Sequence, residues 1–323
     1  MSSVAREQPM PQLQVIDLGS IMPSELEEIW HYEEQWWREH LLWDISHPLA
    51  ALRRVIERRG VLGKVVRVGT QTVGYAYYVI TGNLGLLAGL VVAPAWNTPE
   101  VGASLLQATV EAIRQRGVQR IESPCVSITA PWLVPVCERV GLQAAWRVFL
   151  RVELARLHAS VPSTGLVQLD PWQDRHLDES AAIMQAAYQG TVDAELNVLY
   201  RTEEGCSSIL ENLQQGGCGP LVAEASVLAR SRERCIGFIV VTEIAPQQGH
   251  LAQVAVLPAY QRQGVGRRLV HHCLTQLAAH HFDTLSLIVS RANQRAFRLY
   301  EAMGLQEILA FPVFVWEQPQ SAY

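Results

Sequence analysis

A turn with two glycines at the start of a helix is the part of the sequence best suited to bind an anion. The run from Leu251 to Gly266 reads LAQVAVLPAYQRQGVG, and an amphipathic stretch, RRLVHHCLTQLAA, follows it directly. The first N–H groups of a helix have no intrahelical partner, and the helix dipole adds partial positive charge there. Gly264 and Gly266 lack the Cβ atoms that would keep a phosphate away from these amides. The turn therefore predicts an anion site, with a pyrophosphate as its natural ligand.

A second helical segment places two polar residues where they could face this turn. After an apolar stretch, Thr284 to Val289, that is typical of a buried parallel strand, the chain reads SRANQRAFRLYEAMGLQEI. Asn293, Ala296 and Tyr300 recur at spacings of three and four, so they lie on one face of a helix. A glycine turn alone is weak evidence for a ligand, but the turn and this helix occur in order and at a fitting separation.

Together the two motifs resemble a known family. The run V-x-V-x-P-x-Y-Q-x-x-G-x-G, followed by N-x-x-A-x-x-L-Y-x-x-x-G-L, resembles the two signature motifs of the GNAT family of acyl-CoA-dependent N-acyltransferases. The resemblance implies that the turn binds the pyrophosphate of coenzyme A and that the strand and the asparagine bind its pantetheine arm. The implied cofactor-binding residues are Val254, Ala255, Val256, Gln261, Arg262, Gln263, Gly264, Val265, Gly266, Arg267, Asn293 and Ala296. A Rossmann site fits less well, because Leu269 stands where its third glycine is required.

The resemblance also implies the reaction, a transfer of an acetyl group from acetyl-CoA to a primary amine by direct attack on the thioester. Tyr300 corresponds to the tyrosine that commonly protonates the departing thiolate, and a backbone amide near Val256 would donate to the thioester oxygen. Because a thiolate is already a fair leaving group, loss of Tyr300 should slow the transfer rather than abolish it. Arg267 would reach the adenosine phosphate of the co-substrate or remain a plain surface charge.

The base that takes a proton from the amine is not singled out by the sequence. Many relatives carry a glutamate on the fourth or fifth strand, where this chain has Gln253 and Ile288. The candidates are Glu243, which we take as the base, His250, Glu224 and a chain of waters. Asp193 and Glu195 lie where relatives contact their acceptor, so they would attract a cationic amine.

The chain of 323 residues is long for one domain, and its elements predict two domains of the α/β class with mixed sheets. We expect tandem GNAT-like domains, each a mostly antiparallel sheet flanked by helices with a central parallel strand pair, similar to the mycothiol synthase family. The ranges are 12–154 for the first domain, 155–165 for a linker and 166–323 for the domain that carries the acetyltransferase motifs. Residues 1–11 are expected to be a disordered lead.

The first half repeats the order of elements of the second half without its chemistry. The positions of Gln263, Gly264, Asn293 and Tyr300 are taken by Pro99, Glu100, Ala130 and Cys137. The proline removes an amide donor, and the carboxylate would repel a phosphate. We therefore expect a degenerate, structural first domain that does not bind coenzyme A. A nucleophilic Cys137 is the alternative, and a buried thiol is favoured because no base lies nearby in the sequence.

Composition limits the remaining classes of function. The chain has 49% hydrophobic and 18% charged residues and a net charge of -5, which argues against disorder and non-specific nucleic-acid binding. It has six cysteines without C-x-x-C spacing, no apolar signal core at its N-terminus, and no apolar run long enough to span a bilayer. These features predict a cytoplasmic protein without a membrane segment. His271 and His272 point about 100° apart on a helix, so no metal site is expected.

The expected acceptor is a small-molecule or peptide amine. Exposed strand edges or the tryptophan-rich helix that follows Pro23 could form a homodimer contact. Two alternatives stay open, a protein or peptide N-terminal acetylase and a non-catalytic acyl-CoA binding or sensing protein. A sensor would bind acyl-CoA without any turnover that depends on an acceptor.

Overall fold

The computed structural model describes residues 12–123, 130–156 and 167–319, so the expected lead at 1–11 and most of the expected linker at 155–165 lie outside the described residues. The chain divides into two compact units. Unit 1 comprises the described parts of Met1–Gln35, Ser46–Ala144 and Pro312–Tyr323, and unit 2 comprises Trp36–Ile45 and the described part of Ala145–Phe311. The ranges 12–154 and 166–323, as domains with separate roles, stay a prediction.

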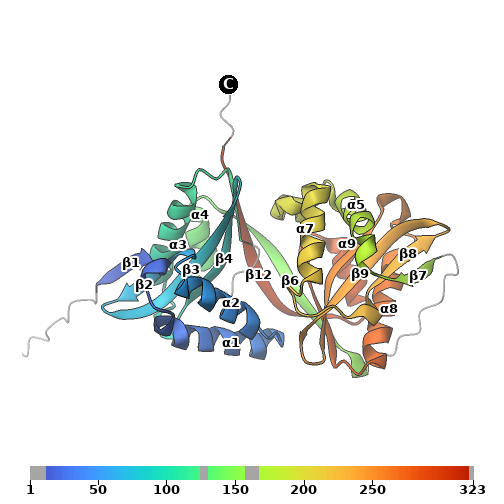
Figure 1. Cartoon of the computed structure of the whole chain (residues 1–323), viewed down its shortest axis with the longest axis horizontal. Coiled ribbons are helices and arrows are strands. Elements are labelled where there is room, and N and C mark those ends of the chain that lie inside the picture. The colour runs from blue at the N-terminus through green and yellow to red at the C-terminus, as the bar shows by residue number, and fades with distance from the viewer. Residues whose placement is uncertain (1–11, 124–129, 157–166, 320–323) are drawn as a thin grey trace, which may run out of the picture. The chain divides into compact units, whose positions relative to one another are not determined.

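Unit 1 is a mixed sheet with helices on both faces (Figure 1). Its strands lie in the order β1, β2, β3, β4, β5 and β12, and neighbours are antiparallel except for the parallel pair β4 and β5. The strands span Leu13–Asp17 (β1), Leu62–Val68 (β2), Gln71–Thr81 (β3), Leu84–Val92 (β4), Arg120–Ser123 (β5) and Gln306–Glu317 (β12). The helices are Glu27–Leu41 (α1), Ser46–Glu57 (α2), Pro99–Arg114 (α3) and Leu133–Arg139 (α4). The end of α1, from Trp36, and the start of β12, up to Phe311, belong to unit 2.

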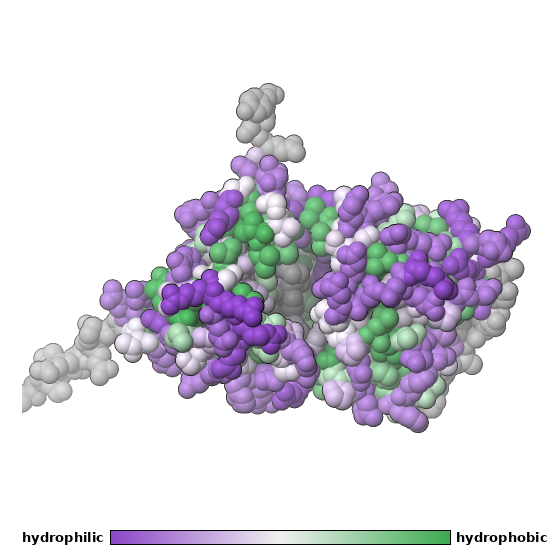
Figure 2. Space-filling view, viewed as in Figure 1, coloured by the Kyte–Doolittle hydropathy of each residue, from purple (hydrophilic) through white to green (hydrophobic). Residues whose placement is uncertain are grey.

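Side chains along the strands of unit 1 alternate between two buried clusters. Tyr75 and Val91 pack with α1 and α2, whereas Ala76 and Val92 pack with α3 and α4. Because successive side chains of a strand point to opposite faces, this alternation places one helix pair on each face of the sheet. The outer side of α2 carries exposed charged residues, and this region is hydrophilic in Figure 2.

Unit 2 has the same plan. Its strands lie in the order β6, β11, β10, β9, β8 and β7, with β10 and β11 as the parallel pair. The strands span Gln143–Glu153 (β6), Gln168–Pro171 (β7), Val227–Ser231 (β8), Arg234–Ala245 (β9), Gln248–Val256 (β10) and Thr284–Ser290 (β11). The helices are Leu177–Tyr188 (α5), Val192–Leu196 (α6), Glu203–Gln214 (α7), Val265–Ala279 (α8) and Gln294–Glu301 (α9). Phe238 and Val240 pack with α5 and α7, and Ile239 and Val241 pack with α8 and α9.

Each unit contains an end strand from the other half of the sequence. β6 closes the first half of the sequence, yet it pairs with β11 in unit 2, with Val148 opposite Val289. β12 closes the second half, and its part from Pro312 onward belongs to unit 1, where Phe314 lies opposite Ser123 of β5. The prediction of mixed sheets with a central parallel strand pair is confirmed. The exchange of end strands was not expected.

Candidate functional site

A cavity opens in unit 2 where the two parallel strands separate. β10 and β11 pair only over Gln248–Leu251 and Thr284–Leu287, and the register of β10 shifts between Leu251 and Gln253. Beyond this point residues of both strands line a cavity of about 640 Å³. A strand edge that leaves its neighbour has backbone N–H and C=O groups without ladder partners. The separated strands therefore form a slot in which an extended ligand can bind main-chain atoms.

The glycine turn lines the same cavity, next to the end of β10. Gly264 is the N-cap of α8 and has a φ of 84°, in the left-handed region that favours glycine. The N–H of Arg268 donates to the carbonyl of Gly264 at 3.0 Å, so the amides of residues 265–267 precede the first bond of this helix. A Cβ added to Gly264 would meet no atom within 4 Å. The turn is thus open to a ligand on the side of these amides.

Glutamine and arginine side chains fix this turn and make it electropositive. Gln261 Nε2 donates to the carbonyl of Val256 at 2.9 Å, and Gln261 Oε1 accepts from Arg295 Nη1 at 2.7 Å. Arg262, Arg267 and Arg295 line the cavity here. Free helix amides and guanidinium groups together fit a polyanion such as a pyrophosphate.

Most of the residues predicted to bind the co-substrate line the cavity. They are Val254, Ala255, Val256, Gln261, Arg262, Gly264, Gly266, Arg267, Asn293 and Ala296. The side chain of Gln263 turns back instead and donates to the carbonyl of Ala259 at 2.8 Å. The side chain of Val265 is buried in the hydrophobic core. Gln263 and Val265 can therefore serve a ligand only through their backbone.

Tyr300 reaches the cavity from α9 and is only 6% exposed. Burial raises the pKa of Tyr300, and the carboxylate of Asp193 raises it further. The hydroxyl is therefore protonated at neutral pH and can donate a hydrogen bond to a developing thiolate. Asn293 holds this helix in place, because its Oδ1 accepts from the N–H of Ala296 at 3.2 Å while its Nδ2 donates to Asp193 at 3.3 Å.

Two tyrosines that the sequence did not single out form one wall of the cavity. The rings of Tyr188 and Tyr200 stack with centroids 4.2 Å apart and an interplanar angle of 7°. The hydroxyl of Tyr188 donates to Gln253 Oε1 at 3.3 Å, and Gln253 Nε2 donates to the hydroxyl of Tyr200 at 2.8 Å. Gln253 on β10 thus positions the aromatic wall, and as an amide it is not a base. Tyr188 ends α5 and Tyr200 lies in a short 3-10 helix after α6, so no periodic pattern in the sequence signals this pair.

Asp193 on α6 is the only carboxylate among the described residues that line the cavity. One of its oxygens accepts from the hydroxyl of Ser290, and the other accepts from Asn293. Glu195, its expected companion, does not line the cavity. A carboxylate in this cavity attracts an ammonium group, which is the form of a primary amine at neutral pH.

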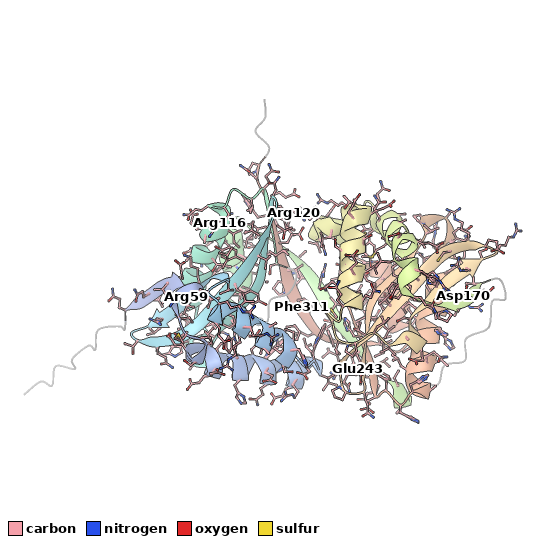
Figure 3. The ribbon with its side chains drawn as sticks, viewed as in Figure 1. Arg59, Arg116, Arg120, Asp170, Glu243 and Phe311 are labelled. Atoms are coloured by element: carbon pink, nitrogen blue, oxygen red, sulfur yellow. The ribbon has the colours of Figure 1, made fainter. Side chains whose placement is uncertain are left out.

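The structure does not bring the candidate bases to the cavity. Glu243 lies near the end of β9, where its Oε1 accepts from the N–H of Gln247 at 2.8 Å (Figure 3). His250 is buried, and its Nδ1 lies 3.0 Å from the hydroxyl of Ser286. Glu224 lies in a short 3-10 turn before β8. None of these three candidates lines the cavity.

The buried His250 makes the stability of the protein depend on pH. Burial lowers the pKa of His250 to about 4, below its ordinary value of about 6.5. Between these values the unfolded chain binds a proton that the folded chain does not, so unfolding becomes easier as the pH falls from 6.5 to 4. We expect a slope of about 1.4 kcal/mol per pH unit in the free energy of unfolding. Because burial also lowers the pKa values of His176 and His272, urea denaturation at several pH values should show that His250→Gln reduces the slope and that the exposed His281→Gln keeps it.

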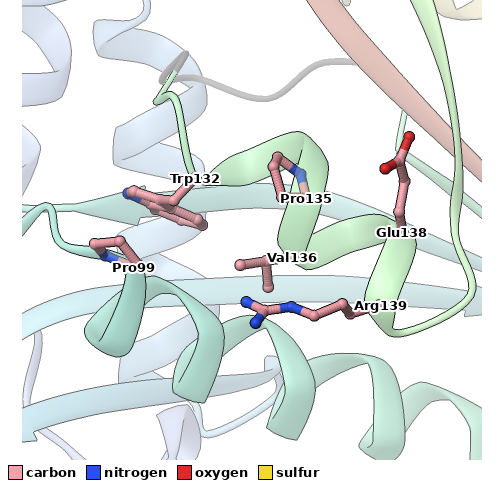
Figure 4. Close-up of a pocket in the computed structure, with 6 residues that line it drawn as sticks. All are labelled: Pro99, Trp132, Pro135, Val136, Glu138 and Arg139. Atoms are coloured by element: carbon pink, nitrogen blue, oxygen red, sulfur yellow. The ribbon is translucent and has the colours of Figure 1, made fainter.

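The corresponding place in unit 1 is filled by Trp132. Its indole Nε1 donates to Asn97 Oδ1 at 2.8 Å, and a Cβ added to Gly102 would lie 2.3 Å from its ring. Asn97 and Gly102 stand where the second half has Gln261 and Gly266. A shallow cavity of about 560 Å³ beside the indole is lined by Pro99, Trp132, Pro135, Val136, Glu138 and Arg139 (Figure 4). An aromatic ring therefore covers the helix start that is open in unit 2.

Other kinds of site find little support within the described ranges. No group of three or more histidine, cysteine, aspartate or glutamate side chains there could hold a metal ion. No helix in the same ranges has the length and apolar character needed to cross a membrane. Burial raises the pKa of Cys137, so its thiol is protonated and a poor nucleophile. Cys125 lies outside the described residues.

Part of the chain is similar in sequence to known proteins. Residues 196–305 match the family model described as the acetyltransferase (GNAT) family. Over 67 residues the chain is 39% identical to the ribosomal protein bS18 alanine N-acetyltransferase of Escherichia coli K12, and the match covers 21% of this chain and 45% of that protein. The corresponding enzyme of Salmonella typhimurium is 36% identical over the same length. The chain thus spans about half the length of the curated relatives that it matches.

Solved structures share the fold. A GCN5-related N-acetyltransferase from Sphaerobacter thermophilus superposes with a TM-score of 0.69 at 12% identity, covering 94% of this chain and 95% of that one. A tandem GNAT protein from the clavulanic acid biosynthesis pathway gives a TM-score of 0.61 at 13% identity, covering 96% of this chain and 100% of that one. At these identities the likeness shows the fold, and it agrees with the predicted tandem arrangement. The family model and most of the residues that line the cavity lie in the second half of the sequence, and the solved structures show that the chain has a GNAT fold.

Proposed function

We propose that the protein is an N-acetyltransferase that moves an acetyl group from acetyl-CoA to a primary amine in the cavity of unit 2. The separation of β10 from β11 carries this proposal, because it opens a slot that is lined by both the glycine turn and Tyr300. The electropositive turn fits the pyrophosphate of the co-substrate, and the strand edges fit the amides of its pantetheine arm. The names of the curated relatives support the same group transfer.

The reaction forms one N–C bond and breaks one C–S bond. The ammonium group first loses a proton to water, and the free amine attacks the thioester carbonyl to give a tetrahedral intermediate. The hydroxyl of Tyr300 donates a hydrogen bond to the sulfur as the C–S bond breaks. Because the pKa of Tyr300 is raised above that of a thiol, the thiolate leaves without a complete proton transfer from the ring. The second proton of the attacking nitrogen then neutralises the thiolate.

We infer that unit 1 is structural and does not bind acetyl-CoA. Trp132 covers Gly102, the counterpart of Gly266, and Glu100 would add a negative charge near a phosphate. Acetyl-CoA is therefore expected to bind with a stoichiometry of one molecule per chain.

The activity is tested by replacing Tyr300 with phenylalanine. Tyr300→Phe is expected to lower kcat by about 10- to 100-fold, because the thiolate loses a hydrogen-bond donor but remains a fair leaving group. The Kd for acetyl-CoA should change by less than about twofold, since the ring stays in place. Release of the thiol with a panel of amines gives kcat, and titration calorimetry gives the Kd. Tyr260→Phe is the control, because Tyr260 does not line the cavity.

The same assay separates an enzyme from a sensor. If the wild-type protein binds acetyl-CoA and no amine in the panel causes thiol release, the acetyltransferase proposal is wrong and a non-catalytic acyl-CoA binding protein replaces it. If Tyr300→Phe and Tyr260→Phe lower kcat equally, Tyr300 has no special part in the chemistry.

A further inference from the structure

Arg147 is a cation in the cavity of unit 2 whose side chain has no partner among the described residues. It lies on β6, the strand that the first half of the sequence contributes to this unit. Its side chain makes no hydrogen bond or ion pair with any described residue, and its Nε is buried without an acceptor. A buried guanidinium nitrogen without an acceptor destabilises the folded chain, so it points to a ligand that supplies one.

The strand register brings Arg147 to the same part of the cavity as Asp193. Arg147 is directly opposite Ser290 in the antiparallel pair of β6 and β11, so both side chains project from the same face of the sheet. The hydroxyl of Ser290 donates to Asp193. A cation and an anion therefore face one space, and no ion pair joins them in the structure.

The aromatic wall lies within reach of both charges. Burial is the main cause of the raised pKa values of Tyr188 and Tyr200; Asp193 raises both values further, and Arg147 opposes the increase. All four side chains line the same cavity. The remaining arginines that line the cavity are Arg262 in the glycine turn, Arg267 in the first turn of α8 and Arg295 on α9, next to the predicted pyrophosphate site. Arg147 is thus the cation on the acceptor side.

We propose that the acceptor is a free amino acid, which binds with its carboxylate on Arg147 and its amine next to Asp193. This inference rests on the proposed acetyltransferase function and names its substrate class. A guanidinium group binds a carboxylate through two parallel N–H···O bonds, and the stacked tyrosine rings can pack on the apolar part of the ligand. The amino terminus of a peptide has an amide in place of this carboxylate, so it would leave the guanidinium without its charged acceptor.

The test compares free amino acids with their C-terminal amides as acceptors for the full chain. Thiol release from acetyl-CoA is followed with the L-amino acids, with their amides and with dipeptides. For the best amino acid, kcat/KM is expected to exceed that of its amide by about 10- to 100-fold, the usual effect of a hydrogen-bonded charge. Arg147→Gln should remove this preference by raising KM for the acid, with KM for the amide and the Kd for acetyl-CoA unchanged. Arg147→Lys should keep part of the preference, because it keeps the charge but loses the bidentate geometry.

Arg151→Gln is the matched control. Arg151 lies four residues along on the same face of β6, also has a buried guanidinium nitrogen without a partner, and does not line the cavity. It should keep the preference for the free acid. Wild-type turnover of amides or dipeptides as fast as that of free acids would overturn the amino-acid proposal and leave the acetyltransferase proposal standing. Absence of thiol release with every amine would overturn both.

Discussion

Replacing Gly264 by glutamate is expected to weaken the binding of acetyl-CoA by at least about 100-fold. Gly264 has a φ of 84°, where a residue with a Cβ costs about 1 kcal/mol or more. The new carboxylate would also lie beside the helix amides and arginine side chains proposed to bind the pyrophosphate, where it would repel the phosphates and pair with the same groups. Titration calorimetry of the full chain with acetyl-CoA measures the change.

Two further variants separate charge from backbone strain. Gly264→Ala adds the same strain without a charge, and its Cβ would meet no atom within 4 Å, so we expect a loss of no more than about tenfold. Gly82→Glu adds a glutamate at an equally open position with a φ of 55°, in the turn between β3 and β4, and should leave the affinity unchanged. An affinity of Gly264→Glu equal to that of the wild type would show that this turn is not the pyrophosphate site.

The turn and the helix of Tyr300 could be predicted because their geometry is local. Gly264 takes its left-handed conformation from the end of a strand and the start of a helix that are contiguous in sequence. Asn293 and Tyr300 share a face because α9 is one regular helix. Sequence motifs describe such short-range arrangements well, and the family match over residues 196–305 agrees with them.

The acceptor side could not be predicted in the same way, because it is assembled from distant segments. Tyr188, Tyr200 and Arg147 meet only through the packing of α5, the 3-10 helix Val198–Arg201 and β6. The apolar pattern of a strand shows which face is buried, but not which neighbour it pairs with, so the sequence does not show that β6 pairs with β11. Glu243 is an acidic residue near the end of β9. It lies opposite Gly249, where β10 still pairs with β11, and the cavity opens beyond that point.

Phe314 on the exchanged strand β12 is expected to contribute strongly to the stability of the protein. Phe314→Ala is expected to lower the free energy of unfolding by about 3 to 5 kcal/mol. Phe314 is 1% exposed and packs in the core of unit 1 with residues of β5 and α3, although it lies near the end of the chain. Removing its ring would leave a cavity that the sheet and helices cannot close fully. Urea denaturation followed by tryptophan fluorescence measures the loss.

Ile308→Ala on the same strand is the control for Phe314→Ala. The side chain of Ile308 is 39% exposed, so its removal should change the free energy of unfolding by no more than about 0.5 kcal/mol. Below its unfolding transition, Phe314→Ala should bind acetyl-CoA as the wild type does, because every residue that lines the cavity lies in unit 2. If Phe314→Ala is no more destabilising than Ile308→Ala, β12 does not complete the core of unit 1 in solution. The expected loss of stability would show that the first half of the sequence needs β12 to complete its fold. In the same way, the proposed acceptor site in the second half needs Arg147 from β6, a strand of the first half.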